Sequence, residues 1–276
     1  MAKILSISSE VIRGHVGHAA SRFVLQRLGH DVWAFPTILL SNHPGHENFS
    51  GEPTDPAHLE KMRDSLDGNG WLGEIDAVFT GYLPSAEHAE FAAETVRLVK
   101  SRSPNAKVLT DPAFGDDPKG LYIDEGAAAK IDSDLLPLAD FVTPNRFELG
   151  WLAQAPVTTL DEARRAAKEA DFPVLLATSI PGDADGALCN LLVEEQITMT
   201  TTVKRRHAAP HGTGDMMAAL FLGHFLNEKS SEEAMARATG AVEIVLQASE
   251  GADELVLVPT QELWVNAEPW PVERIG

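Results

Sequence analysis

Two glycines and a carboxylate lie together where a strongly apolar helix is expected to begin. Residues 211–221 read HGTGDMMAALF, and the residues after Asp215 are apolar on every face. Gly212 and Gly214 let the backbone turn tightly and approach another group closely. Asp215 has two interpretations. It marks the start of a core helix, where a carboxylate satisfies free N–H groups and complements the dipole, or it is a base beside an anion site, since a helix N-terminus after glycines binds phosphate.

Further carboxylates follow a predicted strand in TDPAFGDDPKG, residues 110–120. Asp111 ends that strand, and Asp116 and Asp117 lie in the loop beyond it. Carboxylates in this arrangement can orient a hydrated Mg²⁺, which prefers a few carboxylates together with phosphate oxygens. Asp-Pro and Gly-Asp are also turn formers, so a structural turn is the alternative.

A similar choice applies to TPNRFELGWL, residues 143–152. The spacing of Asn145 and Glu148 matches a capping box at a helix start. The same two side chains could hold the water shell of a metal ion, and the two roles are compatible.

Histidines occur in two close pairs, His15 with His18 and His43 with His46. A zinc site is weakly supported, because neither pair lies clearly on a helix face and no cysteine or HExxH pattern accompanies it. Polar loop residues or substrate contacts are favoured. The sequence also lacks GxxxxGK[ST], a GxGxxG after its first strand and a GxSxG elbow. P-loop enzymes, dinucleotide-binding proteins and serine hydrolases are therefore poorly supported.

The composition indicates a globular protein with an acidic surface. Of the 276 residues, 44% are hydrophobic, which is enough for a sizeable core. The 41 acidic against 22 basic residues give a net charge of −19, which disfavours nucleic acid and anionic membranes as partners. Cys189, the single cysteine, lies in an apolar run, so we expect its side chain to be buried. A single cysteine also suits a protein of a reducing compartment. Without a signal-peptide pattern or roughly 18–20 consecutive apolar residues, a soluble cytoplasmic protein is expected.

The elements that must position these residues alternate between strands and helices. Strands are predicted at 3–8, 31–36, 76–82, 106–111, 139–145, 172–179 and 253–259, with a hairpin at 186–203 whose turn lies at 194–196. Helices are predicted at 17–29, 57–70, 85–102, 212–227 and 231–248, and a long loop at 40–56. This alternation predicts one α/β domain over residues 1–276, with a mostly parallel sheet covered by helices on both faces. Ligands of such sheets lie outside the carboxyl ends of the strands, where the polar motifs fall.

Taken together, the motifs resemble the ribokinase-like superfamily and, within it, the pyridoxal kinases. GTGD at 212–215 resembles the anion-hole motif of the superfamily. A nearly continuous likeness runs through SEVIRGHVGHAA at 9–20 and RLGHDVWAFPTILLSNHPGH at 27–46. TGYLPSAE, TDPAFGDDPKGLY and ADFVTPNRFEL follow in the order and spacing of the family. The resemblance covers about residues 3–250 and implies a ribokinase-like three-layer sandwich.

The resemblance also implies a reaction, in which ATP phosphorylates the 5′-hydroxymethyl group of pyridoxal. Asp215 would take the hydroxyl proton, and the backbone N–H groups of Gly212, Thr213, Gly214 and Asp215 would stabilise the transferring group. Pyridoxine and pyridoxamine are further candidate acceptors. MgATP is the implied co-substrate, a monovalent-cation requirement stays open, and a homodimer is typical of the family.

The other implied site residues form three groups. The substrate side consists of Ser9, Val16, His43 and Tyr82. In the family, the residue at Ser9 hydrogen-bonds the polar edge of the pyridine ring, and the residue at Tyr82 packs on the ring. Asp111, Asn145 and Glu148 surround Mg²⁺ and the phosphates, with Asp111 and Glu148 as the metal residues and Asp116 and Tyr122 on the nearby loop. The nucleotide contacts are Thr143, Thr178, Ser179, Val203, Lys204, Arg205 and Arg206. The last three residues also supply local positive charge for a triphosphate, with a solvated turn as the alternative.

Two departures from the family pattern bear on the substrate. Pro44 replaces the common threonine after SNH and has neither a hydroxyl nor an N–H, so vitamer preference is expected to differ. Ala113 and Phe114 replace a Val-Met pair and are expected to reshape an apolar wall. The alternatives are a kinase of hydroxymethylpyrimidine or another small alcohol, and a non-catalytic vitamer-binding protein. Retention of Asp215 with both glycines argues against the binder, since a binder has no use for a base beside an anion hole.

Overall fold

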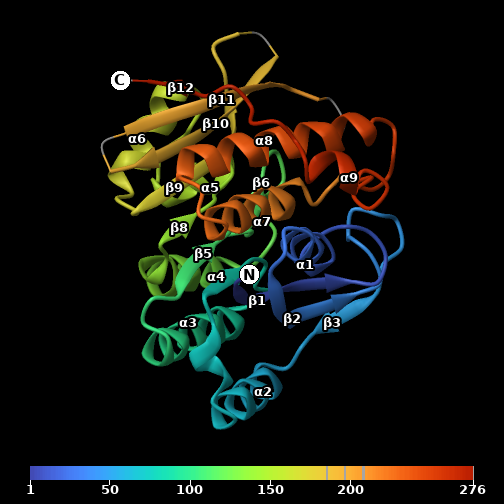
Figure 1. The fold of residues 1–276 in the computed structure, drawn as a ribbon, viewed down its shortest axis with the longest axis vertical. Coiled ribbons are helices and arrows are strands. Elements are labelled where there is room, and N and C mark those ends of the chain that lie inside the picture. Colours follow the sequence, from blue (N-terminus) through green and yellow to red (C-terminus); the bar gives the residue numbers. More distant parts are fainter. Residues whose placement is uncertain (185, 196, 207–208, 276) are drawn as a thin grey trace.

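The computed structural model describes residues 1–184, 186–195, 197–206 and 209–275, and a central sheet dominates this part of the chain (Figure 1). Among these residues the sheet has ten strands in the order β12-β11-β10-β9-β8-β5-β4-β1-β2-β3. Its strands are β1 (Lys3–Val11), β2 (Asp31–Leu40), β3 (Gly51–Pro53), β4 (Ala77–Thr80), β5 (Lys107–Thr110), β8 (Phe141–Val142), β9 (Val174–Pro181), β10 (Ala187–Glu194), β11 (Ile197–Lys204) and β12 (Glu273–Arg274). A small antiparallel pair, β6 (Gly115–Asp116) and β7 (Gly120–Leu121), stands apart from it.

Most of the sheet is parallel, as the alternation of strands and helices predicts. Strands β2, β1, β4, β5, β8 and β9 run in the same direction. Antiparallel pairing occurs only at the two sides of the described sheet, where β3 joins β2 and where β10, β11 and β12 follow β9. The predicted hairpin is therefore confirmed as β10 and β11, although Gln196, which we expected in its turn, lies outside the described residues.

The helices are α1 (His18–Arg27), α2 (Pro56–Gly68), α3 (Ala86–Arg102), α4 (Glu125–Lys130), α5 (Arg146–Leu152), α6 (Leu160–Glu169), α7 (Thr213–Leu226), α8 (Ser231–Ala248) and α9 (Gln261–Trp264), with shorter turns at Trp71–Glu74, Ile131–Leu135 and Leu136–Leu138. Side chains cap the N-termini of α2, α3, α4, α5, α6 and α8, whereas α1, α7 and α9 begin without a side-chain cap. The side chain of Ser85 accepts from the backbone N–H of His88, and Ser230 accepts from Glu233 in the same way. These bonds satisfy N–H groups that have no partner inside the helix.

Apolar side chains on both faces of the sheet explain why helices cover both. Neighbouring residues of a strand point to opposite faces, and Ile4 and Leu5 of β1 are both fully buried. Ile4 belongs to the core that α1, α7 and α8 form with one face, whereas Leu5 packs with α3 on the other. In Figure 1, α7 and α8 (orange) lie together with α1 (blue) beside α7. The predicted sandwich of helices on both faces of a central sheet is confirmed.

Two expectations about elements were wrong. The segment 253–259 is not a strand but a series of turns, and the last strand of the sheet is β12. Leu255 and Leu257 are buried in the core, so their alternation with exposed neighbours imitates a strand pattern. The backbone N–H of Val256 instead donates to the hydroxyl of Ser249. The stretch 40–56 is not wholly a loop, because β3 pairs with β2 within it.

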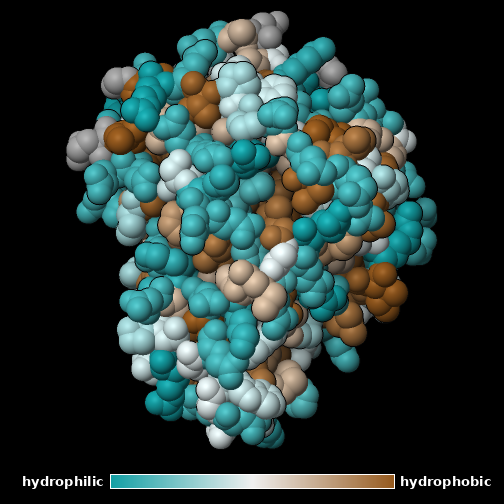
Figure 2. All heavy atoms as spheres, viewed as in Figure 1, coloured by the Kyte–Doolittle hydropathy of each residue, from teal (hydrophilic) through white to brown (hydrophobic). Residues whose placement is uncertain are grey.

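The face shown in Figure 2 is mostly hydrophilic, with separate hydrophobic patches, as the acidic composition predicts. Within the described ranges, every helix is too short or too polar to cross a membrane. Cys189 is buried, in agreement with its apolar sequence context.

Candidate active site

Backbone hydrogen bonds align the predicted site residues along the carboxyl ends of the parallel strands. The N–H of Gly81, just after β4, donates to the carbonyl of Ile7 over 2.9 Å. In the same way Asp111 donates to Thr80 over 2.9 Å, and Thr143 donates to Thr110 over 3.1 Å. Because each strand end is tied to the strand beside it, the residues that follow β1, β4, β5 and β8 meet at one edge of the sheet.

Asp215 lies in the first turn of α7 at this edge. The N-cap of α7 is Gly212, which has φ 97° and no side chain. A Cβ on Gly212 would lie 1.9 Å from the carbonyl oxygen of His15, so the segment preceding α7 needs glycine here to contact the loop after β1. The backbone N–H of Gly17, on that same loop, is close enough to the carboxylate of Asp215 to lower its pKa. The described structure therefore brings a segment from outside α7 near this carboxylate.

Burial makes Asp215 a weaker acid than an exposed aspartate. The half-buried carboxyl group loses part of its hydration, and this raises the pKa from 3.8 to about 6, whereas the nearby backbone N–H of Gly17 lowers it. A carboxylate with a pKa near neutrality is suited to accept a proton and release it again.

Gly17 also touches Ser9, so one glycine lies between two predicted site residues. Gly17 has φ 55°, and a Cβ on it would lie 2.2 Å from the Oγ of Ser9 and 2.3 Å from the Ser9 carbonyl oxygen. The side chain of the preceding residue Val16 packs with Val11 and Leu40 in a small apolar cluster. The loop after β1 therefore brings Ser9, Val16 and Asp215 to one place.

Asp111 and Glu148 add two more buried carboxyl groups at this edge. Burial, followed by the charges of Glu148 and Asp215, raises the pKa of Asp111 well above 3.8. Burial also raises the pKa of Glu148 to about 7, although hydrogen bonds from backbone N–H groups oppose the rise. The three acids are thus close enough to influence one another and are largely removed from water.

Glu148 holds two segments of backbone together. Its Oε1 accepts from the N–H of Phe114 over 2.9 Å and of Gly115 over 3.4 Å, and its Oε2 accepts from Asn145 over 2.9 Å. The predicted capping box is confirmed, since the side chain of Asn145 accepts from the N–H of Glu148 at the start of α5. Asn145 also donates through Nδ2 to the carbonyl of Gly115.

The donor set fits a hard divalent cation that brings most of its own ligands. Asp111 offers a buried carboxylate beside the charges of Glu148 and Asp215, and a cation would relieve that repulsion. Both oxygens of Glu148 already accept from the backbone, so its contact with such an ion would run through water. Among the residues that the structure describes, His, Cys, Asp and Glu form no cluster of three or more that could enclose a metal. Mg²⁺ keeps several waters and uses substrate phosphates as ligands, so a single carboxylate such as that of Asp111 could hold it with the nucleotide.

Two tyrosines lie beside the acidic group. The rings of Tyr82 and Tyr122 stack with centroids 6.2 Å apart and planes at 29°. The backbone N–H of Tyr82 donates to the Oγ of Ser8 over 3.2 Å, next to Ser9. Burial and the charges of Glu148, Asp111, Asp215 and Asp116 raise the pKa of Tyr122, which places its hydroxyl near those acids. Asp116 itself is exposed on β6.

The predicted nucleotide contacts lie farther along the sheet, just after β8, on β9, and at or just after the end of β11. Thr143 is buried, and its Oγ1 has no hydrogen-bond partner in the described part of the chain. Thr178 forms a parallel bridge with Asn145, and Ser179 beside it is exposed with φ 60°. Val203 and Lys204 end β11, and the N–H of Arg205 donates to Gly186.

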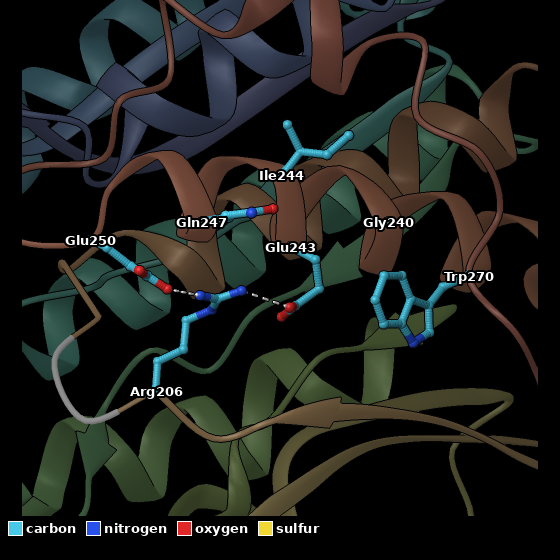
Figure 3. A pocket seen from close by; sticks show the side chains of 7 residues that line it. All are labelled: Arg206, Gly240, Glu243, Ile244, Gln247, Glu250 and Trp270. Atoms are coloured by element: carbon cyan, nitrogen blue, oxygen red, sulfur yellow. Dashed lines mark hydrogen bonds and ion pairs between the residues drawn. The ribbon is translucent and has the colours of Figure 1, made fainter.

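Arg206 differs from the sequence-based expectation. It reaches toward α8 and pairs with Glu243 over 3.0 Å and with Glu250 (Figure 3). These two carboxylates neutralise the charge that we expected to be available to a triphosphate. The three residues border a cavity of about 310 Å³ that Gly240, Ile244, Gln247 and Trp270 also line.

His43 is half-buried, and its ring stacks on His211 with centroids 3.8 Å apart and planes at 23°. Pro44 is exposed in the same loop. Phe114 is fully buried, with its ring edge-on to Trp151 at 5.0 Å, so this departure from the family pattern changes the packing of the core.

Sequence reasoning missed the residues that act through their backbone or through a distant ring. Gly17 was visible in the GHVGH motif but had no assigned role, although its N–H lies near the carboxylate of Asp215 and lowers its pKa. The N–H groups of Phe114 and Gly115 carry no signal in the side-chain pattern. His211 precedes the glycines directly, and that position was its only signal.

Comparisons with known proteins agree with this arrangement. A family model described as phosphomethylpyrimidine kinase matches residues 52–255. The pyridoxal kinase PdxY of Corynebacterium diphtheriae is 33% identical over 266 residues, which cover 94% of this chain and 94% of that protein. The pyridoxal kinase PdxY of Rubrobacter xylanophilus is 35% identical over 283 residues, covering 99% and 97%. A solved structure of pyridoxal kinase from Leishmania donovani in complex with ADP and pyridoxamine has a TM-score of 0.93 at 27% identity, covering 100% of both chains.

These neighbours share the ribokinase-like fold with this chain, from β1 through the helices that cover both faces of the sheet. The chain belongs to the pyridoxal kinases of the phosphomethylpyrimidine kinase family.

Proposed function

We propose that the protein transfers the γ-phosphoryl group of ATP to the 5′-hydroxymethyl group of pyridoxal, giving pyridoxal 5′-phosphate. The observation that carries this proposal is the placement of Asp215. It is a half-buried carboxylate in the first turn of α7, near Gly17, which in turn lies against Ser9. The pyridoxal kinase relatives, and the neighbour with bound ADP and pyridoxamine, supply the substrate class.

In the proposed mechanism Ser9, Val16, His43 and Tyr82 hold the flat ring of the acceptor. Tyr82 offers an aromatic face, and offset packing of this kind contributes about 0.5–1.5 kcal/mol beyond burial. Asp215 accepts the proton of the acceptor hydroxyl as the oxygen attacks the γ-phosphorus in line. A pKa of about 6 keeps the carboxylate ionised at neutral pH and still able to hold the proton.

The backbone at the start of α7 stabilises the charge that gathers on the transferring group. The N–H groups of Gly212, Thr213, Gly214 and Asp215 lie in the first turn, where four N–H groups of a helix lack internal partners. Asp111 and, through water, Glu148 would hold Mg²⁺, which neutralises phosphate charge. The nucleotide would be faced by residues of the adjacent loop and of the sheet edge: Asp116, Tyr122, Thr143, Asn145, Thr178, Ser179, Val203, Lys204 and Arg205. Arg206 pairs with Glu243 of α8 and with Glu250 instead.

A coupled ADP-release assay tests the proposal. Purified protein with MgATP is given pyridoxal, pyridoxine, pyridoxamine or hydroxymethylpyrimidine in turn, and the product is identified by its absorbance and mass. Phosphorylation of pyridoxal with the highest kcat/KM supports the proposal. Preference for hydroxymethylpyrimidine favours the pyrimidine kinase that the family description names. Binding of pyridoxal without ADP release favours the non-catalytic binder.

We also propose that the chain acts as a single kinase domain, in the cytoplasm, as a homodimer. Ile12, Leu39 and Phe49 are apolar yet 79%, 49% and 53% exposed, and they lie on segments that neighbour one another at one side of the sheet. Apolar side chains of this kind are typical of an interface. Light scattering of wild type and Phe49→Asp tests the dimer, with a twofold mass for wild type as the supporting result.

A further inference from the structure

Residues 41–50 form a loop between β2 and β3 that we name the cover loop. The N–H of Ser41 donates to the carbonyl of Ser50 over 2.7 Å, and the N–H of Ser50 donates to the Oγ of Ser41 over 2.9 Å. Inside the loop, Nδ2 of Asn42 donates to the carbonyls of His43 and Asn48. These bonds give the loop a defined shape although most of its residues are exposed.

Two histidines attach the cover loop to segments that are distant in sequence. Nε2 of His46 lies 3.0 Å from Oε1 of Glu254, which also accepts from Arg13 over 2.9 Å. The ring of His43 stacks on His211, the residue just before Gly212. The second contact joins the cover loop directly to the backbone that starts α7.

Gly45 shows how closely the stacked rings are packed. Its N–H donates to Nδ1 of His43 over 2.9 Å, so that nitrogen is an acceptor and the neutral ring carries its proton on Nε2. A Cβ on Gly45 would lie 2.8 Å from Nδ1 of His43 and 3.0 Å from Nε2 of His211. The loop backbone therefore rests against both rings.

Burial is the main reason that both rings favour the neutral form. Burial, then His211, Lys119 and His46, lower the pKa of His43 to about 4. Burial and then Lys119 lower the pKa of His211, while Asp116 and Glu254 act in the opposite direction. Two neutral imidazoles can stack face to face without charge repulsion, so the contact persists at neutral pH.

We propose that His211 is a positioning residue for the acceptor: its ring holds His43, and through it the cover loop, against the start of α7. This inference rests on the proposed function. The cover loop leaves β2 at Leu40, which packs on Val16 beside the Ser9 side of the site. The predicted nucleotide contacts Thr143, just after β8, and Thr178, on β9, lie on the other side of β4 and β5 in the sheet order. Loss of the stack should therefore change KM for the acceptor and leave KM for ATP unchanged.

Steady-state kinetics of His211→Ala test this inference. We expect KM for pyridoxal to rise about 2- to 12-fold, the range that an aromatic pair supplies, while kcat and KM for ATP stay within about twofold. His211→Phe keeps a flat ring and should bring KM for pyridoxal back to within about twofold of wild type. His58→Ala, an exposed histidine on α2, is the matched control.

A double-mutant cycle with His43→Ala makes the test sharper. If the two rings act as one contact, the double variant has the pyridoxal KM of His43→Ala alone. Additive effects overturn the inference, as do equal changes in both KM values or an unchanged His211→Ala. Should His211→Ala fail to fold, His211→Leu takes its place in the cycle, because it removes the flat ring and keeps an apolar side chain of similar size, and the same comparison with His43→Ala then decides between coupled and independent rings. Wild-type protein that does not phosphorylate pyridoxal contradicts the proposed function itself, which distinguishes the two failures.

Discussion

The backbone N–H of Gly17 is close enough to the carboxylate of Asp215 to lower its pKa, so the loop after β1 approaches the first turn of α7. The same glycine lies against Ser9, on the proposed acceptor side. One residue without a side chain thus fixes the distance between the proposed base and the strand that would hold the substrate. The proposed proton transfer depends on that spacing, because a catalytic group must lie within hydrogen-bond reach of the proton it takes.

Gly17→Ala should therefore impair catalysis strongly. The new Cβ would lie 2.3 Å from the carbonyl oxygen of Ser9, and residue 17 has φ 55°, which favours glycine, so the backbone must shift. We expect kcat/KM for pyridoxal to fall about 10²-fold, which a misplacement of about 1 Å can produce. Gly70→Ala is the control, since Gly70 has φ 78° but nothing within 4 Å of a new Cβ. Equal activity of the two variants would show that Gly17 does not position Asp215.

The pH profile should show the titration of Asp215. Burial raises its pKa to about 6, so the carboxyl group is increasingly protonated as the pH falls below that value. A protonated base cannot accept the hydroxyl proton, and log kcat/KM should drop with a slope of about one per pH unit below about pH 6. The measurement is kcat/KM for pyridoxal from pH 8 to pH 5, with circular dichroism at each pH to verify folding. A flat profile over this range would argue against Asp215 as the base.

Glu148→Gln should destabilise the fold. The carboxylate accepts backbone N–H groups on both oxygens, and an amide NH₂ would leave one of these donors unsatisfied. The expected loss in the free energy of unfolding is about 1–3 kcal/mol, measured by urea denaturation. Glu162→Gln, in the exposed capping box at the start of α6, is the matched control and should have little effect. Equal stabilities of the two variants would contradict the structural role of Glu148.

Side-chain patterns predicted the features that depend on neighbouring residues in the chain. The spacing of Asn145 and Glu148 was enough to predict the capping box at α5, and alternating strands and helices were enough to predict the parallel sheet. The same kind of pattern wrongly predicted a strand at 253–259. Leu255 and Leu257 pack into the core from turns, so the alternation of buried residues there comes from tertiary packing without strand pairing.

Contacts between distant segments were outside the reach of the sequence. Nothing in KRR at 204–206 shows that Arg206 turns toward Glu243 and Glu250 on α8. The stack of His43 on His211 likewise depends on how the loop after β2 folds back over the start of α7. The sequence left the two interpretations of Asp215 open, because the approach of Gly17 to its carboxylate depends on tertiary structure.

The most direct test of the proposed mechanism is the turnover of Asp215→Asn. Asparagine keeps the shape of the side chain, and the neutral amide removes a buried charge whose raised pKa disfavours the folded state above pH 6, so stability at pH 8 should be unchanged or higher. We expect ATP binding to persist and kcat with pyridoxal to fall roughly 10²-fold or more, as for the loss of a general base. A folded variant that binds ATP and turns over pyridoxal at nearly the wild-type rate would contradict the assignment of Asp215.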